Sequence, residues 1–280
     1  MGRYFPYTLH PMSVAECIND ASIQFSSQGV INREPRKIDR EQWDALWRFG
    51  GFPEPFLKAS QRFYNRWRSL RQEQLLREDI RELTRIRQLG QIEMLAEYIR
   101  HQVGQLTSYS YLSRNIRVSV DTVRRWIATL EALYFCFTVR PWHRNVARAL
   151  RKEPKYYLWD WSDINDPGIR AENLVACALL KAVQYWTETG QGEFELYFVR
   201  DKQKREVDFL VVSDNSPWFL VEVKSSRSSG ISHSLRYFQN QTNAKHAFQI
   251  ALDMDFIERD CFELNEPTVV PVKTFLSQLV

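Results

Sequence analysis

Two short segments, Arg205-Glu-Val-Asp-Phe-Leu-Val-Val212 and Trp218-Phe-Leu-Val-Glu-Val-Lys224, decide the fold of this chain. Both are rich in β-branched and aromatic residues, and a five-residue loop, Ser213-Asp-Asn-Ser-Pro217, separates them. Two such runs around a short polar loop are typical of a β-hairpin. If the loop is centred on Asn215, the numbers of opposed residues sum to 430. This register places Asp208 opposite Glu222 and Leu210 opposite Leu220.

The hairpin therefore sets two carboxylates against each other on largely apolar strands. Directly opposed side chains lie roughly 4.5–5.5 Å apart at Cβ, and like charges there are destabilising. We expect a cation to hold Asp208 and Glu222 together, and a divalent metal is the first candidate. The same register places Lys224 opposite Glu206. In the alternative interpretation Lys224 simply neutralises the neighbouring acids, since a slip of one residue would reorder every pair.

Composition restricts the class of protein. The 280 residues, 44% of them hydrophobic, are enough for two or three packed domains. No apolar stretch reaches the roughly 20 residues that span a bilayer, and the start lacks a signal-peptide pattern, so we expect a cytoplasmic protein without a membrane partner. The four cysteines are far apart, as in a reduced compartment. The 28 arginines outnumber the 10 lysines, which favours a polyanionic partner such as DNA.

The N-terminal part carries little regular pattern. Residues 1–60 contain scattered turn signals, and the run Gly50-Gly-Phe-Pro-Glu-Pro55 predicts irregular structure. From Gln61 to about Arg87 a charge-rich helical pattern follows. Acids are interspersed among its arginines, so the pattern indicates a solvated helix with internal ion pairs.

Residues 91–139 have the pattern of a winged helix-turn-helix. We expect one helix within 94–103, a second over 109–116 and a third with Ser119 as its N-cap, followed by a wing strand over 133–139. In the third helix the spacing predicts a buried stripe of Val123, Ile127, Leu130 and Tyr134.

The opposite face of that third helix carries Arg124 and Arg125, where a recognition helix needs basic groups. Small helical triplets of this shape also dock proteins, so DNA contact and protein contact both stay open.

A basic stretch lies between Arg140 and Lys155, with Glu153 as its one acid. Arg144, Arg148 and Arg151 would share one helical face, which is typical of a phosphate-binding surface. The alternative is an exposed face whose arginines pair with acids elsewhere in the fold. Lys155-Tyr-Tyr-Leu-Trp-Asp160 then predicts a strand.

The last part, from about Asp166, alternates helix and strand as a small α/β unit with a mixed sheet. The expected elements are helix 167–186, strands 194–200, 205–212 and 218–224, helix 233–243 and strand 246–252. Glu172 is followed by apolar residues at +3, +4, +7 and +11, so its carboxylate falls on the buried stripe. A buried acid must be paired, protonated or bound to a metal. A favourable contact with the helix dipole in the first turn is the alternative explanation.

Three acids, Glu172, Asp208 and Glu222, thus converge with Lys224. Oxygen ligands of this kind suit Mg²⁺ or Mn²⁺, and Lys224 would serve as the catalytic cation. An acidic helix followed by two strands with Asp…Glu-X-Lys resembles the PD-(D/E)XK nuclease superfamily. The resemblance implies a Mg²⁺-dependent DNA endonuclease with Asp208, Glu222 and Lys224 as catalytic residues.

Further segments resemble a large prokaryotic family of AAA+-like P-loop ATPases that carry a C-terminal domain of unknown function: Gly51-Phe-Pro-Glu-Pro-Phe-Leu57, Asn145-Val-Ala-Arg-Ala-Leu150, Lys155-Tyr-Tyr-Leu-Trp-Asp160, Arg200…Glu206-Val-Asp208 and Val221-Glu-Val-Lys224. The resemblance implies an α+β chain with an ATPase-core remnant or linker at 1–60, a helical and winged-helix domain at 61–160 and a nuclease-like domain at 161–280.

One hallmark of the ATPase family is missing. The sequence has no Gly-x-x-x-x-Gly-Lys-Ser/Thr, so we expect a C-terminal portion without an ATP site that is not an ATPase by itself. A separate ATPase subunit is then a candidate partner. The alternative function is a non-enzymatic DNA- or protein-binding adaptor with a degenerate nuclease fold.

Overall fold

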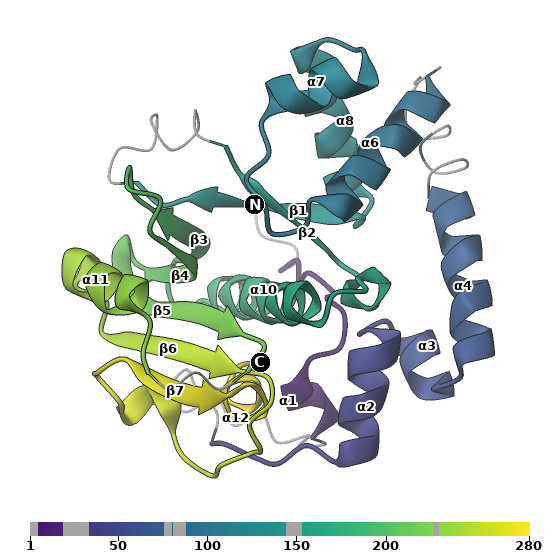
Figure 1. Cartoon of the computed structure of the whole chain (residues 1–280). Helices are drawn as coiled ribbons and strands as arrows, with labels where there is room; N and C mark the ends of the chain where they lie inside the picture. The colour runs from purple at the N-terminus through teal and green to yellow at the C-terminus, as the bar shows by residue number, and fades with distance from the viewer. Residues whose placement is uncertain (1–4, 19–33, 76–79, 81–87, 144–152, 227–229) are drawn as a thin grey trace.

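A mixed β-sheet organises the computed structural model of the chain (Figure 1). The structure describes residues 5–18, 34–75, 80, 88–143, 153–226 and 230–280. Within these residues seven strands form one sheet in the order β2-β1-β3-β4-β5-β6-β7. Pairs β1/β2, β3/β4 and β4/β5 are antiparallel, whereas β1/β3, β5/β6 and β6/β7 are parallel. The strands are β1 Cys136–Pro141, β2 Lys155–Leu158, β3 Phe194–Arg200, β4 Glu206–Ser213, β5 Ser216–Lys224, β6 His246–Ala251 and β7 Thr268–Pro271.

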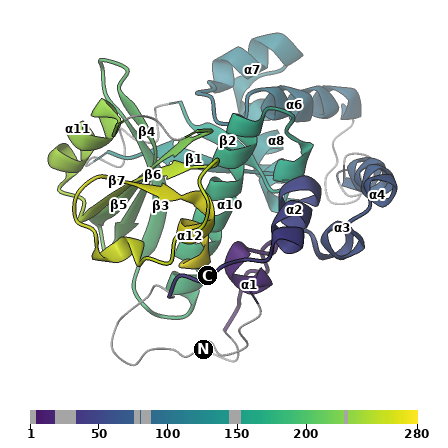
Figure 2. The ribbon, with the colours of Figure 1, turned by 60° about the horizontal axis from the view of Figure 1, so that its bottom comes forward.

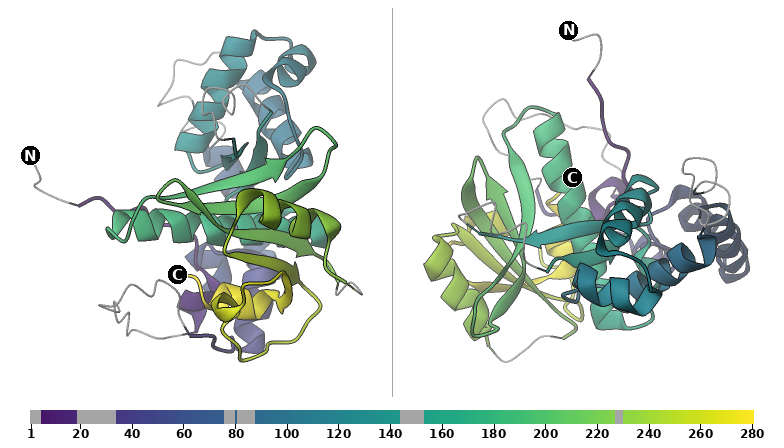
Figure 3. Two further views of the ribbon diagram at one scale, coloured as in Figure 1. Left: turned by 90° about the vertical axis from the view of Figure 1, so that its left-hand side faces the viewer. Right: turned by 90° about the horizontal axis from the view of Figure 1, so that it is seen from above.

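Helices cover both faces of the sheet and extend from one edge of it (Figures 2 and 3). The long helix α10 packs on one face against β2, β3, β4 and β5, and α11 packs on the other against β4, β5 and β6. The expected α+β class with a mixed sheet is confirmed. The described helices are α1 Val14–Cys17, α2 Arg40–Phe49, α3 Pro53–Lys58, α4 Gln61–Glu73, α6 Leu89–His101, α7 Tyr109–Ile116, α8 Val120–Ala132, α10 Pro167–Glu188, α11 His233–Thr242 and α12 Val272–Ser277.

The hairpin of β4 and β5 forms with a tighter turn than we expected. Asp214 and Asn215, both at positive φ (48° and 63°), are its two central residues, and Ser213 pairs with Ser216. Two residues at positive φ match the right-handed twist of the strands. The register shifts between Val211 and Val212. From Val211 toward the start of β4 the strands pair in the predicted alignment, and Leu210 pairs with Leu220.

The three helices expected over residues 91–139 are present as α6, α7 and α8. The Ser119 side chain accepts a hydrogen bond from the Thr122 amide, as an N-cap does. Val123, Ile127 and Leu130 are buried. Tyr134 is 48% exposed, so its place in the core stripe was wrong. The helix ends at Ala132 and Tyr134 takes a positive φ of 54°, which turns its side chain out of the helical stripe.

The strand expected as a wing is β1, and it belongs to the main sheet. It pairs with β2 through Cys136 and Leu158, and with β3 through Arg140 and Tyr197. The helices α6–α8 therefore connect directly to the sheet that carries the acidic residues. The predicted elements end at residue 252. The structure adds strand β7 at the edge of the sheet and helix α12 after it.

The N-terminal part is more regular than its sequence indicated. The expectation of irregular structure over Gly50–Pro55 was wrong for its second half, because α3 begins at Pro53. Proline suits the first helical turn, where its fixed φ is already helical and its missing N–H has no partner to lose. The extended segment before α1 lies along α10, where the Thr8 amide and hydroxyl donate to the Glu188 carboxylate (2.8 and 2.6 Å).

One buried side chain joins β2 to α10. The Asn173 amide group accepts from the Leu158 N–H (2.8 Å) and donates to the Leu158 carbonyl (2.6 Å), and Asn173 is fully buried. In this way a side chain satisfies backbone groups of β2, the edge strand of the described sheet, beyond the point where the 104–107 segment bonds to it. No helix in the described part of the chain is long and apolar enough to cross a membrane.

We predict that Asn173→Ala lowers the free energy of unfolding by about 2–4 kcal/mol, because it leaves a buried N–H and C=O without partners. Urea denaturation followed by circular dichroism measures this change. The exposed Asn65 on α4 provides the matched control, since Asn65→Ala should change stability by less than about 0.5 kcal/mol. If the two substitutions lowered the free energy of unfolding equally, the hydrogen bonds of Asn173 to the Leu158 backbone would not be what stabilises the fold.

Candidate functional site

Asp208 lies where the β4–β5 ladder ends. The last paired residues are Phe209 and Val221, and the next positions along the two strands are Asp208 and Glu222. There the Asp208 carboxylate, through Oδ2, accepts the Val223 N–H at 2.8 Å. The side chain thus takes a hydrogen bond that a neighbouring strand would otherwise supply. This arrangement fixes the carboxylate between the two strands.

The cation closest to this carboxylate was not among our predicted site residues. Lys155, at the start of β2, is 3% exposed. Its Nζ lies 2.7 Å from Glu206 Oε1, 3.4 Å from Glu172 Oε1 and 3.9 Å from Asp208 Oδ1. Burial alone would lower the pKa of this amine, but the surrounding carboxylates more than offset burial and leave the pKa raised.

The sheet must curl for this contact to form. Strands β1 and β3 separate β2 from β4 in the sheet order. Neighbouring strands lie about 4.8 Å apart, so a flat sheet would hold β2 and β4 about 14 Å apart. The Lys155 ammonium nevertheless reaches both acids of β4, which places β2 over the end of β4. The sequence alone did not indicate that Lys155 contacts Glu206 and Asp208.

Glu172 faces the same group from α10. Its Oε1 accepts from the Tyr157 hydroxyl at 2.7 Å, in addition to the contact with Lys155. Its side chain is 21% exposed, so the expected burial is only partial. The helix-dipole explanation was wrong, because α10 begins at Pro167 and has no acid in its first turn. Gly104 approaches the carboxylate so closely that a Cβ there would lie 2.9 Å from Oε1.

Glu222 and Lys224 pair with each other along β5. Lys224 Nζ lies 2.6 Å from Glu222 Oε1. Glu222 is 6% exposed, and its second oxygen, Oε2, is buried without a hydrogen-bond partner among the described residues. The predicted register placed Glu206 opposite Lys224. In the structure Glu206 instead pairs with Lys155 and with Arg200 (2.6 Å). We refer to Glu172, Glu206, Asp208 and Glu222 as the acidic cluster.

With all four carboxylates ionised, the acidic cluster has one more negative charge than the cations that contact it among the described residues. Four carboxylates contact three cations: Lys155, Arg200 and Lys224. Burial and the neighbouring Glu172 raise the pKa of Asp208 to about 7, against the opposing effects of Lys155 and the Val223 N–H. Within the residues that the structure describes, no three His, Cys, Asp or Glu side chains are arranged as a set of metal ligands.

The expected nucleic-acid contacts are divided between described and undescribed residues. Arg124 and Arg125 are exposed on α8, as predicted. Arg124 lies 3.7 Å from Asp121 and over the Tyr109 ring, and Arg125 donates to the Thr122 hydroxyl. Arg144, Arg148 and Arg151 lie outside the described residues.

Comparison with known proteins finds two families. Residues 40–165 match the model described as "Domain of unknown function (DUF8612)", and residues 167–274 match that described as "Domain of unknown function (DUF4143)". The second match includes all four carboxylates of the acidic cluster. Lys155 lies within the first.

Two uncharacterized mycobacterial proteins are similar to the chain, Rv2008c of Mycobacterium tuberculosis and Mb2031c of Mycobacterium bovis. Each is 24% identical over 221 residues, which cover 72% of this chain and 47% of the relative. The chain thus matches about half the length of these relatives. No solved structure matches it significantly.

The raised pKa of Asp208 predicts a pH-dependent stability. A carboxyl group whose pKa is about 7 in the folded state and 3.8 when unfolded binds its proton more tightly in the folded state. Its contribution to stability is therefore lost as the pH rises from about 4 to 7. We predict that the free energy of unfolding of Asp208→Asn falls less between pH 4.5 and pH 8 than that of the wild type, by up to about 3 kcal/mol.

Denaturation curves at the two pH values, with chelator present, measure this difference. Asp44→Asn, which alters an exposed carboxylate on α2, is the control and should follow the wild type. Parallel pH profiles for the wild type and Asp208→Asn would show that Asp208 titrates normally.

Proposed function

We propose that the acidic cluster is a Mg²⁺- or Mn²⁺-dependent phosphodiester-cleaving site of the PD-(D/E)XK type, in a DNA-associated protein. The observation that carries the proposal is the buried Glu222 Oε2, which lacks a partner among the described residues beside an Asp208 with a raised pKa. A buried carboxylate oxygen without a donor is costly. A divalent cation would supply the charge that both groups lack.

The site offers the donor atoms that such an ion takes, although its three carboxylates are not arranged as a ligand set in the described residues. Glu172, Asp208 and Glu222 offer the hard oxygen ligands that Mg²⁺ and Mn²⁺ prefer. These three come from α10, β4 and β5, and the negative charges of Glu172 and Glu222 both raise the pKa of Asp208. The excess negative charge of the cluster adds to the attraction for a dication. The ion, when bound, would supply Lewis acidity toward a phosphodiester.

Each protein group has a role in this proposal. The Val223 N–H holds Asp208 in one orientation, and the Tyr157 hydroxyl does the same for Glu172. Lys224, with a side chain 42% exposed, is the cation of the cluster most open to a substrate, since Lys155 is buried. Its ammonium would bind a phosphate oxygen and stabilise charge that develops there.

We further propose that the helices α6–α8 are a winged-helix module that contacts DNA. Arg124 and Arg125 are exposed on the third helix, which follows a short second helix as in helix-turn-helix proteins. The resemblance to AAA+-like ATPases with a C-terminal domain of unknown function is consistent with the match of residues 167–274, and a separate ATPase subunit remains a candidate partner. We propose a cytoplasmic location, because the four cysteines, far apart in the sequence, are typical of a reduced compartment.

We predict that the purified protein nicks or linearises plasmid DNA with Mg²⁺ or Mn²⁺, and that Asp208→Ala and Lys224→Ala each lower the rate at least 100-fold, as loss of a charged group at a reacting phosphate does. Gel analysis of plasmid topology measures the rate. Arg40→Gln, an exposed change on α2, should leave it unaltered. Cleavage that is the same in Asp208→Ala, Lys224→Ala and the wild type would rule these residues out.

A second candidate function is favoured by Lys155. Its buried ammonium already contacts Glu172, Glu206 and Asp208, as a structural ion pair network would. In that case the fold is a degenerate nuclease that serves as a non-enzymatic DNA- or protein-binding adaptor. A buried charge network can be retained for structural reasons alone.

Calorimetric titration with Mn²⁺ separates the two functions. We predict saturable Mn²⁺ binding to the wild type that is weakened at least tenfold in Glu222→Gln, since this variant keeps the shape of the side chain but loses its charge. Asp44→Asn is again the control. An absence of saturable binding to the wild type would favour the adaptor.

A further inference from the structure

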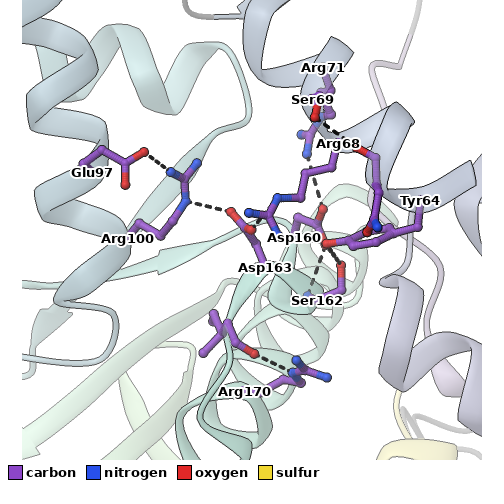
Figure 4. Close-up of polar contacts among 12 residues, drawn as sticks. Tyr64, Arg68, Ser69, Arg71, Glu97, Arg100, Asp160, Ser162, Asp163 and Arg170 are labelled. Carbon is purple, nitrogen blue, oxygen red and sulfur yellow. Dashed lines mark hydrogen bonds and ion pairs between the residues drawn. The ribbon is translucent and has the colours of Figure 1, made fainter. Parts of the chain in front are cut away.

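A second polar cluster lies between the helical part and the sheet, apart from the acidic cluster (Figure 4). A cleft of about 420 Å³, open mouth included, lies between α4, α6 and the segment that follows β2. Three arginines from two helices line it, and two aspartates face them from the end of β2. The lining residues are Trp67, Arg68, Arg71, Gln72, Leu75, Arg100, Phe135, Leu158, Asp160 and Asp163.

Two of the arginines lie at short distance from a carboxylate. Arg68 and Arg100 both pair with the nearly buried Asp163, at Nε–oxygen distances of 2.9 and 2.7 Å. Arg100 also pairs with Glu97. These contacts fix the position of both guanidinium groups at the edge of the cleft (Figure 4).

Arg71 is different. Its carboxylate neighbour, Asp160 Oδ2, is 3.9 Å from Nη1, beyond hydrogen-bond distance, and its Nη2 donates to the Tyr134 carbonyl at 3.3 Å. A guanidinium group has five N–H donors. The Arg71 side chain is 26% exposed, and within the described residues these are its polar partners. Most of its donors therefore remain available to a ligand in the cleft.

The surroundings keep Arg71 in place without satisfying its donors. The guanidinium carbon lies 3.9 Å from the centroid of the Phe52 ring and 5.3 Å from that of Trp67. Stacking of this kind engages the face of the group and leaves the N–H edge free. Burial lowers the pKa of Arg71, which indicates that the nearby acids compensate its charge incompletely.

Asp160 meets Arg71 only at 3.9 Å, and contacts of its other oxygen hold it in that position. Asp160 Oδ1 accepts from the Ser162 N–H at 3.1 Å and from the Ser162 hydroxyl, which also contacts the Tyr64 hydroxyl at 2.9 Å. Gly50 lies against Asp160, and a Cβ there would be 2.6 Å from Oδ1. These contacts fix Asp160 Oδ1, and Oδ2 stays 3.9 Å from Arg71 Nη1.

We infer that this cleft binds a small molecule that carries a phosphoryl or carboxylate group on a planar ring. The oxyanion would accept from Arg71, whose planar fork fits either group. Trp67 and Phe135 offer ring faces, and Leu75 and Leu158 offer apolar contacts, to the rest of the ligand. This binding does not depend on the proposed nuclease function.

Calorimetric titrations with phenyl phosphate, benzoate, inorganic phosphate and phenol test the inference, in 0.15 M salt with chelator so that no metal takes part. We expect saturable binding of phenyl phosphate or benzoate with a Kd on the order of 0.1–1 mM. Inorganic phosphate, without a ring, and phenol, without an oxyanion, should bind at least tenfold more weakly. The better of the two ring oxyanions identifies the anionic group.

Arg71→Gln should weaken binding of the preferred probe about tenfold to a hundredfold, because charge-assisted hydrogen bonds are lost. Arg40→Gln removes the same charge from an exposed position and should bind as the wild type does. If Arg71→Gln does not fold, Arg71→Lys keeps the charge but loses the fork, and Trp67→Leu removes a ring wall. Each should weaken ring-bearing probes at least threefold.

Two results would overturn the inference. One is the absence of saturable binding of any ring oxyanion to the wild type. The other is equal affinity for the preferred probe in Arg40→Gln and in a folded variant at Arg71, which would show that the probe responds only to the positive charge of the whole protein.

Discussion

The buried ammonium of Lys155 is the interaction on which the arrangement of the site depends. A charge that is 3% exposed is tolerated only because carboxylates surround it. The acids also depend on Lys155, since three carboxylates from α10 and β4 repel one another and need a cation between them. This one side chain therefore brings the edge strand β2, the long helix α10 and the hairpin to a common point.

Strand β2 also links the two polar regions of the molecule. At its start Lys155 and Tyr157 contact the acidic cluster, and the residues after its end, Asp160 and Asp163, face the arginines of α4 and α6. Between them Asn173 holds the backbone of Leu158. Because β2 is held at three places along a few residues, the helical part and the sheet are joined through a short and well-anchored segment.

Local sequence patterns predicted the elements well and the long-range contacts poorly. The helix at 109–116, the cap at Ser119 and the strands of the hairpin follow from periodicity and capping, which depend on neighbouring residues. Tyr134 continued the apolar spacing, but the helix had already ended, so periodicity alone misplaced it. The tight turn at Asp214-Asn215 could have been found, since Asp and Asn tolerate positive φ.

Three of the four acids of the acidic cluster were identified from the sequence as site residues, whereas Glu206 and Lys155 were not. Glu172, Asp208 and Glu222 stand out because each interrupts an apolar pattern within its own element. Lys155 lies next to a basic stretch and resembles an exposed lysine at the start of a strand. Its burial arises from the curl of the sheet, which brings together strands that are far apart in the sequence order. No pattern within a single element contains that information.

The position of Lys155 also bears on whether a metal ion and this lysine exclude each other. Lys155 contacts Glu172, Glu206 and Asp208 Oδ1, whereas the oxygen without a partner is Glu222 Oε2, on the neighbouring strand. Asp208 interacts with both Lys155 and Glu222, because Lys155 lowers the pKa of Asp208 and Glu222 raises it. The deficit of positive charge is thus on the side of the cluster formed by Asp208 and Glu222. A lysine that fixes the acids from one side leaves the other side negative, so a structural role for Lys155 and a divalent ion at Glu222 are compatible on electrostatic grounds.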